Sequence, residues 1–134
     1  MNAPQSSSSS TLSTLSPLEA ARKIAPLVRE NAGEIEKTRE LPRPVFEAIA
    51  DAGLFLLCVP KSLGGGEIDF PTQIRIAEVL GLADASTAWC LGQGSGCAMS
   101  AAFLKPAVAK RLFGPRDAVL AWGAGIQGKA MAVD

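Results

Sequence analysis

The 134-residue sequence contains no histidine, and only 5% of its residues are aromatic. Without histidine the chain cannot itself supply a Ser-His-Asp or Cys-His catalytic group, a histidine-ligated zinc site or the commonest general base. Any chemistry therefore has to use carboxylates, a cofactor or residues outside this sequence. No residue of the chain is predicted to be catalytic or to bind a metal.

The chain also lacks a net charge, because 13 Lys and Arg residues balance 13 Asp and Glu residues. Its cations are scattered, so no basic patch is expected to attract nucleic acid or an acidic membrane.

No run reaches the 18 or so apolar residues of a spanning helix, and the N-terminus lacks the pattern of a secretory signal. Three cysteines, Cys58, Cys90 and Cys97, lack CxxC spacing and lie in apolar surroundings. We therefore expect a cytoplasmic protein that binds neither nucleic acid nor membrane.

Residues 1–15 are rich in Ser and Thr, so the entropy cost of ordering them has no hydrophobic offset, and they predict a disordered tail. A helical domain over residues 16–116 is expected to follow. Its first helix starts at Ser16-Pro17-Leu18-Glu19, a capping-box sequence, and apolar residues recur at helical spacing to about Thr38. Pro26 should kink this helix because its nitrogen cannot donate a hydrogen bond.

Further start and stop signals predict four more helices. The expected helices run from Leu41-Pro42 to Gly53, from about Asp69 to Ala83, from Ala85 to about Phe103 after the cap Asp84, and from Pro106 to Phe113. The apolar run 54–60 is expected to cross the core in extended form. The glycines at 64–66 predict a tight turn rather than a phosphate cradle, since no Lys-Ser/Thr follows.

The helix expected after Asp84 consists largely of small residues, among them Gly92, Gly94 and Gly96. Each glycine inside a helix costs about 1 kcal/mol relative to alanine, so close contact with a neighbour or a ligand should compensate. Their spacing is not GxGxxG, which argues against dinucleotide binding. Close packing and the wall of a substrate cavity are the two interpretations. Cys97 has no cationic neighbour and is interpreted as a buried, inert thiol.

Residues 117–134 are expected to begin a truncated middle β-domain. Ala118 to Trp122 alternate as a strand does, and Ala130 to Val133 form a possible second strand. The predicted fold class is thus mainly α, with five helices followed by the first one or two strands of a β-domain.

These segments resemble, in order and spacing, the amino-terminal helical domain of the acyl-CoA dehydrogenase superfamily over about residues 17–134. The resemblance rests on Leu41-Pro42 with Ala52-Gly53-Leu54-Phe55, on Val59-Pro60 with Leu63-Gly64-Gly65 and Glu67-Ile68-Asp69, and on Glu78-Val79-Leu80 with Asp84-Ala85-Ser86-Thr87-Ala88-Trp89. It implies a flavoprotein whose full members have a helical domain, a β-domain and a carboxy-terminal four-helix bundle. FAD lies between these domains, usually in a homo-oligomer, and the catalytic base comes from the carboxy-terminal domain.

The resemblance also implies binding residues. Trp122, Gly123 and Ala124 match the stretch whose backbone meets the flavin, and Trp89, Gly94 and Ser95 lie in the region that approaches the substrate. Burial in the core is the other interpretation of Trp89, and cross-strand packing is the other interpretation of Trp122.

Three functions follow as hypotheses. The first is a flavin-dependent oxidoreductase in which this chain forms one wall of the cavity for flavin and an acyl-CoA or other small-molecule substrate. The second is a two-component monooxygenase, supplied with reduced FMN or FAD by a reductase. The Ser86 to Trp89 motif resembles that branch, whose members often carry a histidine that is absent here. The third is a non-catalytic helical module that packs against a partner chain.

Overall fold

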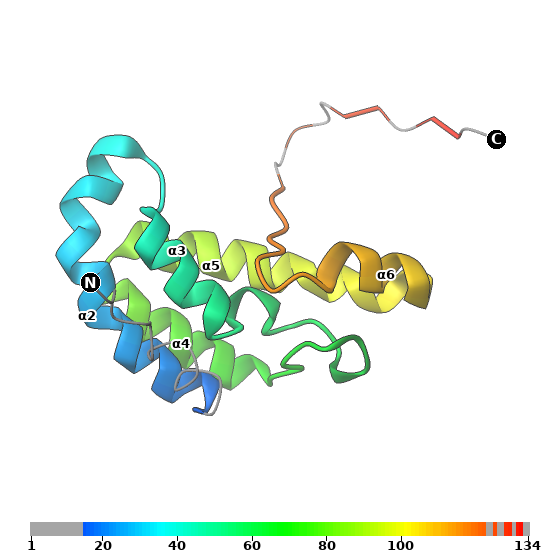
Figure 1. Cartoon of the computed structure of the whole chain (residues 1–134), viewed down its shortest axis with the longest axis horizontal. Coiled ribbons are helices and arrows are strands. Elements are labelled where there is room, and N and C mark those ends of the chain that lie inside the picture. Colours follow the sequence, from blue (N-terminus) through cyan, green and yellow to red (C-terminus); the bar gives the residue numbers. More distant parts are fainter. Residues whose placement is uncertain (1–14, 123–124, 126–127, 130, 133–134) are drawn as a thin grey trace, which may run out of the picture.

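A computed structural model describes residues 15–122, 125, 128–129 and 131–132 (Figure 1). The tail predicted for residues 1–15 lies outside these residues, apart from Leu15. The described part is mainly helical, as the sequence predicts.

The first helix, α2 (Pro17–Thr38), begins with the predicted capping box. The Ser16 hydroxyl accepts a bond from the Glu19 N–H at 3.3 Å, and the Glu19 carboxylate accepts one from the Ser16 N–H at 3.0 Å. The helix continues through Pro26 without interruption, so the missing N–H does not end it. Burial of one apolar stripe offsets the loss of that single bond. The stripe comprises Ala20, Ala21, Ile24, Ala25, Val28 and Ile35.

Helix α3 (Arg43–Asp51) stops where its sequence predicts. Gly53 has φ 69°, a left-handed conformation that glycine adopts at little cost. The following apolar run is buried, but it is not extended as expected. It forms the 3-10 turn η1 (Leu54–Leu56), in which the Leu56 N–H donates to Gly53 O at 3.1 Å. A buried backbone needs hydrogen-bond partners, and tight turns supply them locally.

The short 3-10 turn η2 (Lys61–Leu63) leads into the predicted glycine turn. Gly64 has φ 89°, and a Cβ at Gly65 would lie only 2.1 Å from Val59 O. The chain can therefore fold back closely here, and the Gly66 N–H donates to Leu56 O at 3.0 Å. These contacts confirm a turn built for backbone packing.

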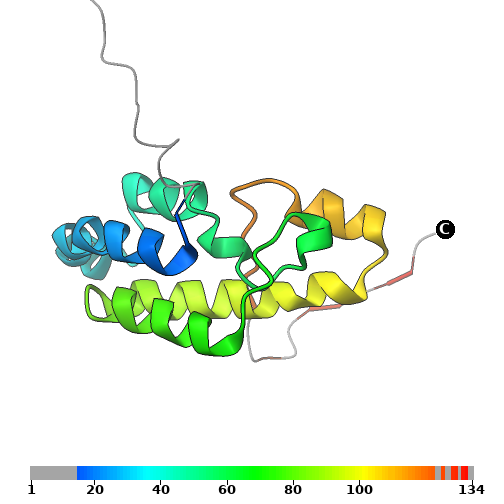
Figure 2. The same cartoon turned by 90° about the horizontal axis from the view of Figure 1, so that it is seen from below.

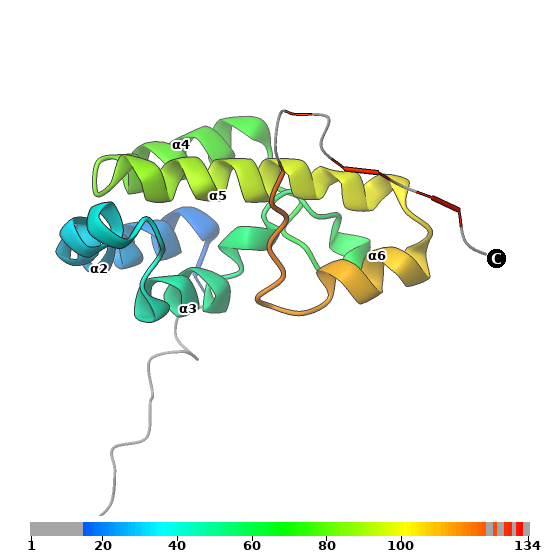
Figure 3. The ribbon, with the colours of Figure 1, turned by 90° about the horizontal axis from the view of Figure 1, so that it is seen from above.

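Two helices with aspartate caps follow, α4 (Phe70–Gly81) and α5 (Ala85–Cys97). The helix expected to reach Phe103 changes after Cys97 to the 3-10 segment η3 (Ala98–Phe103), and α6 (Pro106–Phe113) completes the helical part. Figures 2 and 3 show α4 and α5 side by side in one layer, with α2, α3 and α6 in the other. The main core lies between the layers and includes Ile24, Val28, Ile49, Leu54, Ile76, Leu80 and Leu91.

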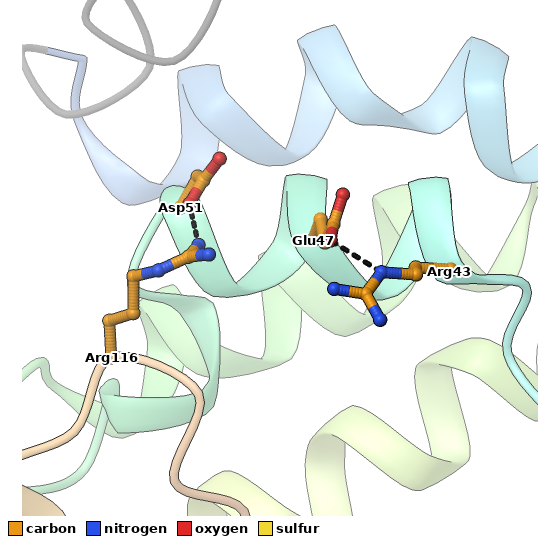
Figure 4. Close-up of polar contacts among 4 residues, drawn as sticks. All are labelled: Arg43, Glu47, Asp51 and Arg116. Atoms are coloured by element: carbon orange, nitrogen blue, oxygen red, sulfur yellow. Dashed lines mark hydrogen bonds and ion pairs between the residues drawn. The ribbon is translucent and has the colours of Figure 1, made fainter.

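After α6 the chain forms the exit segment, which we define as residues 114–122. Arg116 makes an ion pair with Asp51 at the end of α3 (Figure 4), and the segment then passes from the α6 layer to α5 (Figure 3). The prediction of a strand over Ala118–Trp122 is wrong. Within the described part of the chain, these residues have no strand pairing. A strand requires a neighbouring backbone, which the alternating pattern alone cannot supply. The predicted second strand, 130–133, includes residues outside the described ones. The assignment of residues 117–134 to a β-domain stays a prediction.

Candidate functional site

An open, uncharged groove runs between α4 and α5, with a volume of about 370 Å³. We call it the α4–α5 groove. Its floor is made of small residues, so the two helices leave space that larger side chains would fill. Within the described part of the chain, the lining comprises Ala77, Gly81, Ala85, Ala88, Trp89, Gly92 and Gln93, of which only Trp89 and Gln93 have large side chains. Such a surface suits a flat or linear apolar group with a single polar contact.

Trp89 lies on this groove with 69% of its surface exposed, so the interpretation of Trp89 as a core residue is wrong. The reason lies in the geometry of α5. Thr87 and Leu91 are buried, and Trp89 lies two positions from each of them. Residues two positions apart point to nearly opposite sides of a helix, so Trp89 points away from the core. The sequence did not reveal this orientation because α5 is apolar on both sides.

Gly94 and Ser95, which the sequence placed with Trp89 in a substrate site, face elsewhere. Both are buried. A Cβ at Gly94 would lie 3.3 Å from the Val119 Cγ1 atom, so the exit segment covers it. The Ser95 hydroxyl accepts a hydrogen bond from the Gln73 amide of α4 at 3.3 Å. Of the three predicted substrate-binding residues, the structure places only Trp89 on the groove.

Trp122, the predicted flavin-contacting residue, reaches the same part of α5. Its indole N–H donates a hydrogen bond to the Gln93 side-chain oxygen, and 57% of its surface is exposed. Gly123 and Ala124 lie outside the described residues. Because Gln93 also lines the groove, it connects the predicted substrate residue Trp89 to the predicted cofactor residue Trp122. Sequence reasoning missed Gln93, although a carboxamide between two glycines is unusual in a helix of small residues.

Among the described residues that line the groove, none has a charged side chain. Asp84 caps α5 by accepting bonds from the Thr87 N–H at 2.6 Å and the Ser86 hydroxyl at 2.7 Å. Partial burial acts to raise the pKa of this carboxyl, but the hydrogen bonds from Ser86 and Thr87 outweigh it and hold the pKa below its usual value. Asp84 therefore stabilises the helix that carries the groove and is not poised to transfer a proton.

The three cysteines differ in burial, and none of them is among the residues that line the groove in the described part of the chain. Cys58 is half-buried, and desolvation raises its pKa, which makes it a poor nucleophile. Cys97 is half-buried rather than fully buried, and its interpretation as an inert thiol stays a prediction. Cys90 is exposed, which corrects the expectation that all three pack as small apolar residues. Among the described residues, no three potential metal ligands come together.

A second cavity, of about 540 Å³, differs from the groove by being lined with charges of both signs. It lies along α3, and Figure 4 shows its two arginines in ion pairs, Arg43 with Glu47 and Arg116 with Asp51. Because both arginines of this cavity, Arg43 and Arg116, already have a carboxylate partner, it offers no strong anion site. We therefore assign the candidate site to the α4–α5 groove.

Comparisons with known proteins agree with the helical architecture. A family model described as "Acyl-CoA dehydrogenase, N-terminal domain" matches residues 18–113, which span the helices from α2, apart from its first residue, to α6. No curated protein and no solved structure matches the chain. Within the described residues, no helix is both long and apolar enough to cross a membrane.

Proposed function

Because the chain belongs to the acyl-CoA dehydrogenase N-terminal domain family, we propose that it is the helical part of a flavin-dependent oxidoreductase. In this proposal the α4–α5 groove forms one wall of the cavity for flavin and substrate. The observation that carries the proposal is the convergence at Gln93. This residue lines the groove next to Trp89 and accepts the hydrogen bond of Trp122.

The described residues fit a planar aromatic group. Two indole rings, those of Trp89 and Trp122, stay largely exposed beside a groove without charges. Exposed aromatic rings gain free energy when a flat ring covers them, and the small residues of the floor allow close approach. Trp89 and Trp122 would hold such a group.

Hydride acceptance is the chemistry that flavin supplies when bound, and the chain's own residues would bind, orient and exclude water. An uncharged groove fits this division, because it offers no acid or base. FAD is the proposed cofactor, with reduced FMN or FAD from a reductase as the alternative. The proposed substrate is an acyl-CoA or another small molecule, and the proposed assembly is a cytoplasmic homo-oligomer.

The experiment uses the fact that the chain has only two tryptophans. A nitrogen–proton correlation spectrum of the labelled protein therefore contains two indole signals, and the Trp89→Phe variant assigns them. FAD and FMN, oxidised and chemically reduced, are titrated to millimolar concentration. We expect both indole signals and the amides of the groove to shift together, and the preferred flavin to act at the lowest concentration.

Phe103→Ala is the control, since Phe103 is 89% exposed on η3 and does not line the groove. Trp89→Ala should weaken the flavin-induced shifts, whereas Phe103→Ala should leave them unchanged. The proposal fails if no flavin shifts either indole signal, or if Trp89→Ala binds flavin as well as the original chain does.

A further inference from the structure

The exit segment rests on α5 at two consecutive residues, Gln93 and Gly94. A Cβ at Gly94 would lie 3.3 Å from Val119 Cγ1 and 3.4 Å from Leu120 O, so both a side chain and the backbone of the segment occupy that space. One residue earlier along α5, the Gln93 side chain accepts the hydrogen bond from the Trp122 indole. The segment is thus held against the helix up to Trp122, the first residue of the stretch predicted to meet the flavin.

The neighbouring glycines show that this contact is specific. A Cβ at Gly92 would meet nothing within 4 Å, and a Cβ at Gly96 would meet only the Gln73 amide nitrogen, at 3.7 Å. Among the three glycines of α5, only Gly94 has the exit segment in the space of a side chain. The close contact predicted to offset the cost of helical glycines is therefore found at Gly94.

Gln93 supplies the chemistry that the indole requires. Tryptophan has one donor and no acceptor, so its partner must present an oxygen. The half-buried Gln93 carboxamide does so from the rim of the groove. An apolar residue of the same length would leave the indole N–H to water and would remove the directional contact.

We propose that Gln93 and Gly94 are positioning residues, which dock the exit segment on α5 and so set where Trp122 meets the flavin. The flavin part of this statement rests on the proposed function. The ion pair between Arg116 and Asp51 holds the other end of the segment.

The docking is tested without flavin through hydrogen exchange of the two indole N–H groups. In the original chain we expect Trp122 to exchange roughly fivefold more slowly than in Gln93→Met, which removes the acceptor but keeps the length of the side chain. Gln93→Glu keeps an acceptor oxygen and should restore the slow exchange. Trp89 should exchange equally in all three proteins. Equal exchange of Trp122 in the original chain and Gln93→Met would overturn the proposal.

The glycine contact is tested by a matched pair, Gly94→Leu and Gly92→Leu. Both place the same side chain on the same helix, but only the first displaces Val119 and Leu120. We expect a large shift of the Trp122 indole signal in Gly94→Leu and a small one in Gly92→Leu. If the two variants shift it equally, the role of Gly94 is refuted. Should Gly94→Leu not fold, the Gln93 variants still decide.

The proposed effect of Gln93 on the contact between Trp122 and flavin is measured separately, through the indole signals. When FAD is added to Gln93→Met, the shift induced at Trp122 should shrink severalfold, whereas the shift at Trp89 should persist. An undiminished FAD shift at Trp122 would overturn the positioning role. If FAD shifts neither indole of the original chain, the proposed function fails and takes this flavin role with it. The exchange results would then still establish or refute the docking of the exit segment.

Discussion

The helical domain and the exit segment are held in place in different ways. Helices α2 to α5 share one large cluster of buried residues, in which Leu80 and Ile49 are fully enclosed. The exit segment instead packs Ala118 and Leu120 against the edge of a smaller apolar cluster, and its other contacts are single ones, through Arg116, Val119 and Trp122. A core resists change because many contacts act together, whereas point contacts can be removed singly. The predicted flavin-contacting part is therefore the part whose position single substitutions can alter without unfolding the domain.

The largest effect is expected in the core. Leu80→Ala should lower the free energy of unfolding by about 2–5 kcal/mol, because it leaves a cavity in a packed interior. Leu82→Ala, two residues later and 76% exposed, should change it by less than about 0.5 kcal/mol. Urea unfolding followed by circular dichroism measures both. Similar losses for the two variants would contradict the layered core described above.

The cap of the groove helix should have the next largest effect. Asp84→Ala removes the acceptor for two hydrogen bonds at the start of α5 and should cost about 1 kcal/mol. The exposed Asp117, which caps no helix, provides the control as Asp117→Ala. Urea unfolding at neutral pH compares the two. If Asp117→Ala cost as much as Asp84→Ala, the capping role of Asp84 would be wrong.

Alanine substitutions at Gly92 and Gly94 of α5 should change the free energy of unfolding differently. Gly92→Ala should raise the free energy of unfolding by up to about 1 kcal/mol, since its Cβ would enter open space and alanine favours helix. Gly94→Ala has the same helical advantage, but its Cβ presses on Val119 and Leu120. We therefore expect a smaller gain or a loss. Thermal unfolding of the pair checks this, and an equal gain at both sites would show that the exit segment does not rest on Gly94.

A pH dependence should follow from Asp84, whose pKa is lowered in the folded state. The unfolded chain then binds this proton more readily, so the carboxylate contributes stability above its unfolded pKa of about 3.9. That contribution is lost as the pH falls through the folded pKa. Asp84→Asn, which keeps a capping oxygen, should thus be less stable than the original chain at neutral pH and approach it in acid. A constant difference across the acid range would exclude this linkage.

The smallest effect is expected for the ion pair at the start of the exit segment. Arg116 is 59% exposed and Asp51 26% exposed, so water and salt screen their attraction. Asp51→Asn should cost no more than about 1 kcal/mol, and the cost should fall in high salt. Urea unfolding at two salt concentrations measures it. A larger, salt-independent cost would mean that this end is held as firmly as the core.

The features that sequence predicted correctly depend on local chemistry. Ser16 with Glu19, the cap Asp84 and the helix stop at Gly53 each act within a few residues, so their roles can be read without the fold. The family resemblance could be read as well, because it rests on the order of such local signals, and the family comparison confirms it.

The features that sequence missed depend on partners distant in the chain. The apolar run after Gly53 was expected to be extended, but only its burial was predictable, not its 3-10 turns. Trp89 could not be oriented because both faces of α5 consist of small or apolar residues. Gln93 gained its role from Trp122, which lies 29 residues later. A single sequence gives no direct sign of such a pairing.

The docking of the exit segment on α5 is the central claim, and nuclear Overhauser contacts test it most directly. We predict contacts from the Gly94 α-protons to the Val119 methyl groups and from the Trp122 indole proton to the Gln93 side chain. They should be as reproducible as contacts within the helical domain, such as those between the rings of Phe46 and Phe55. Intact core contacts without any contact between α5 and residues 119–122 would contradict the account.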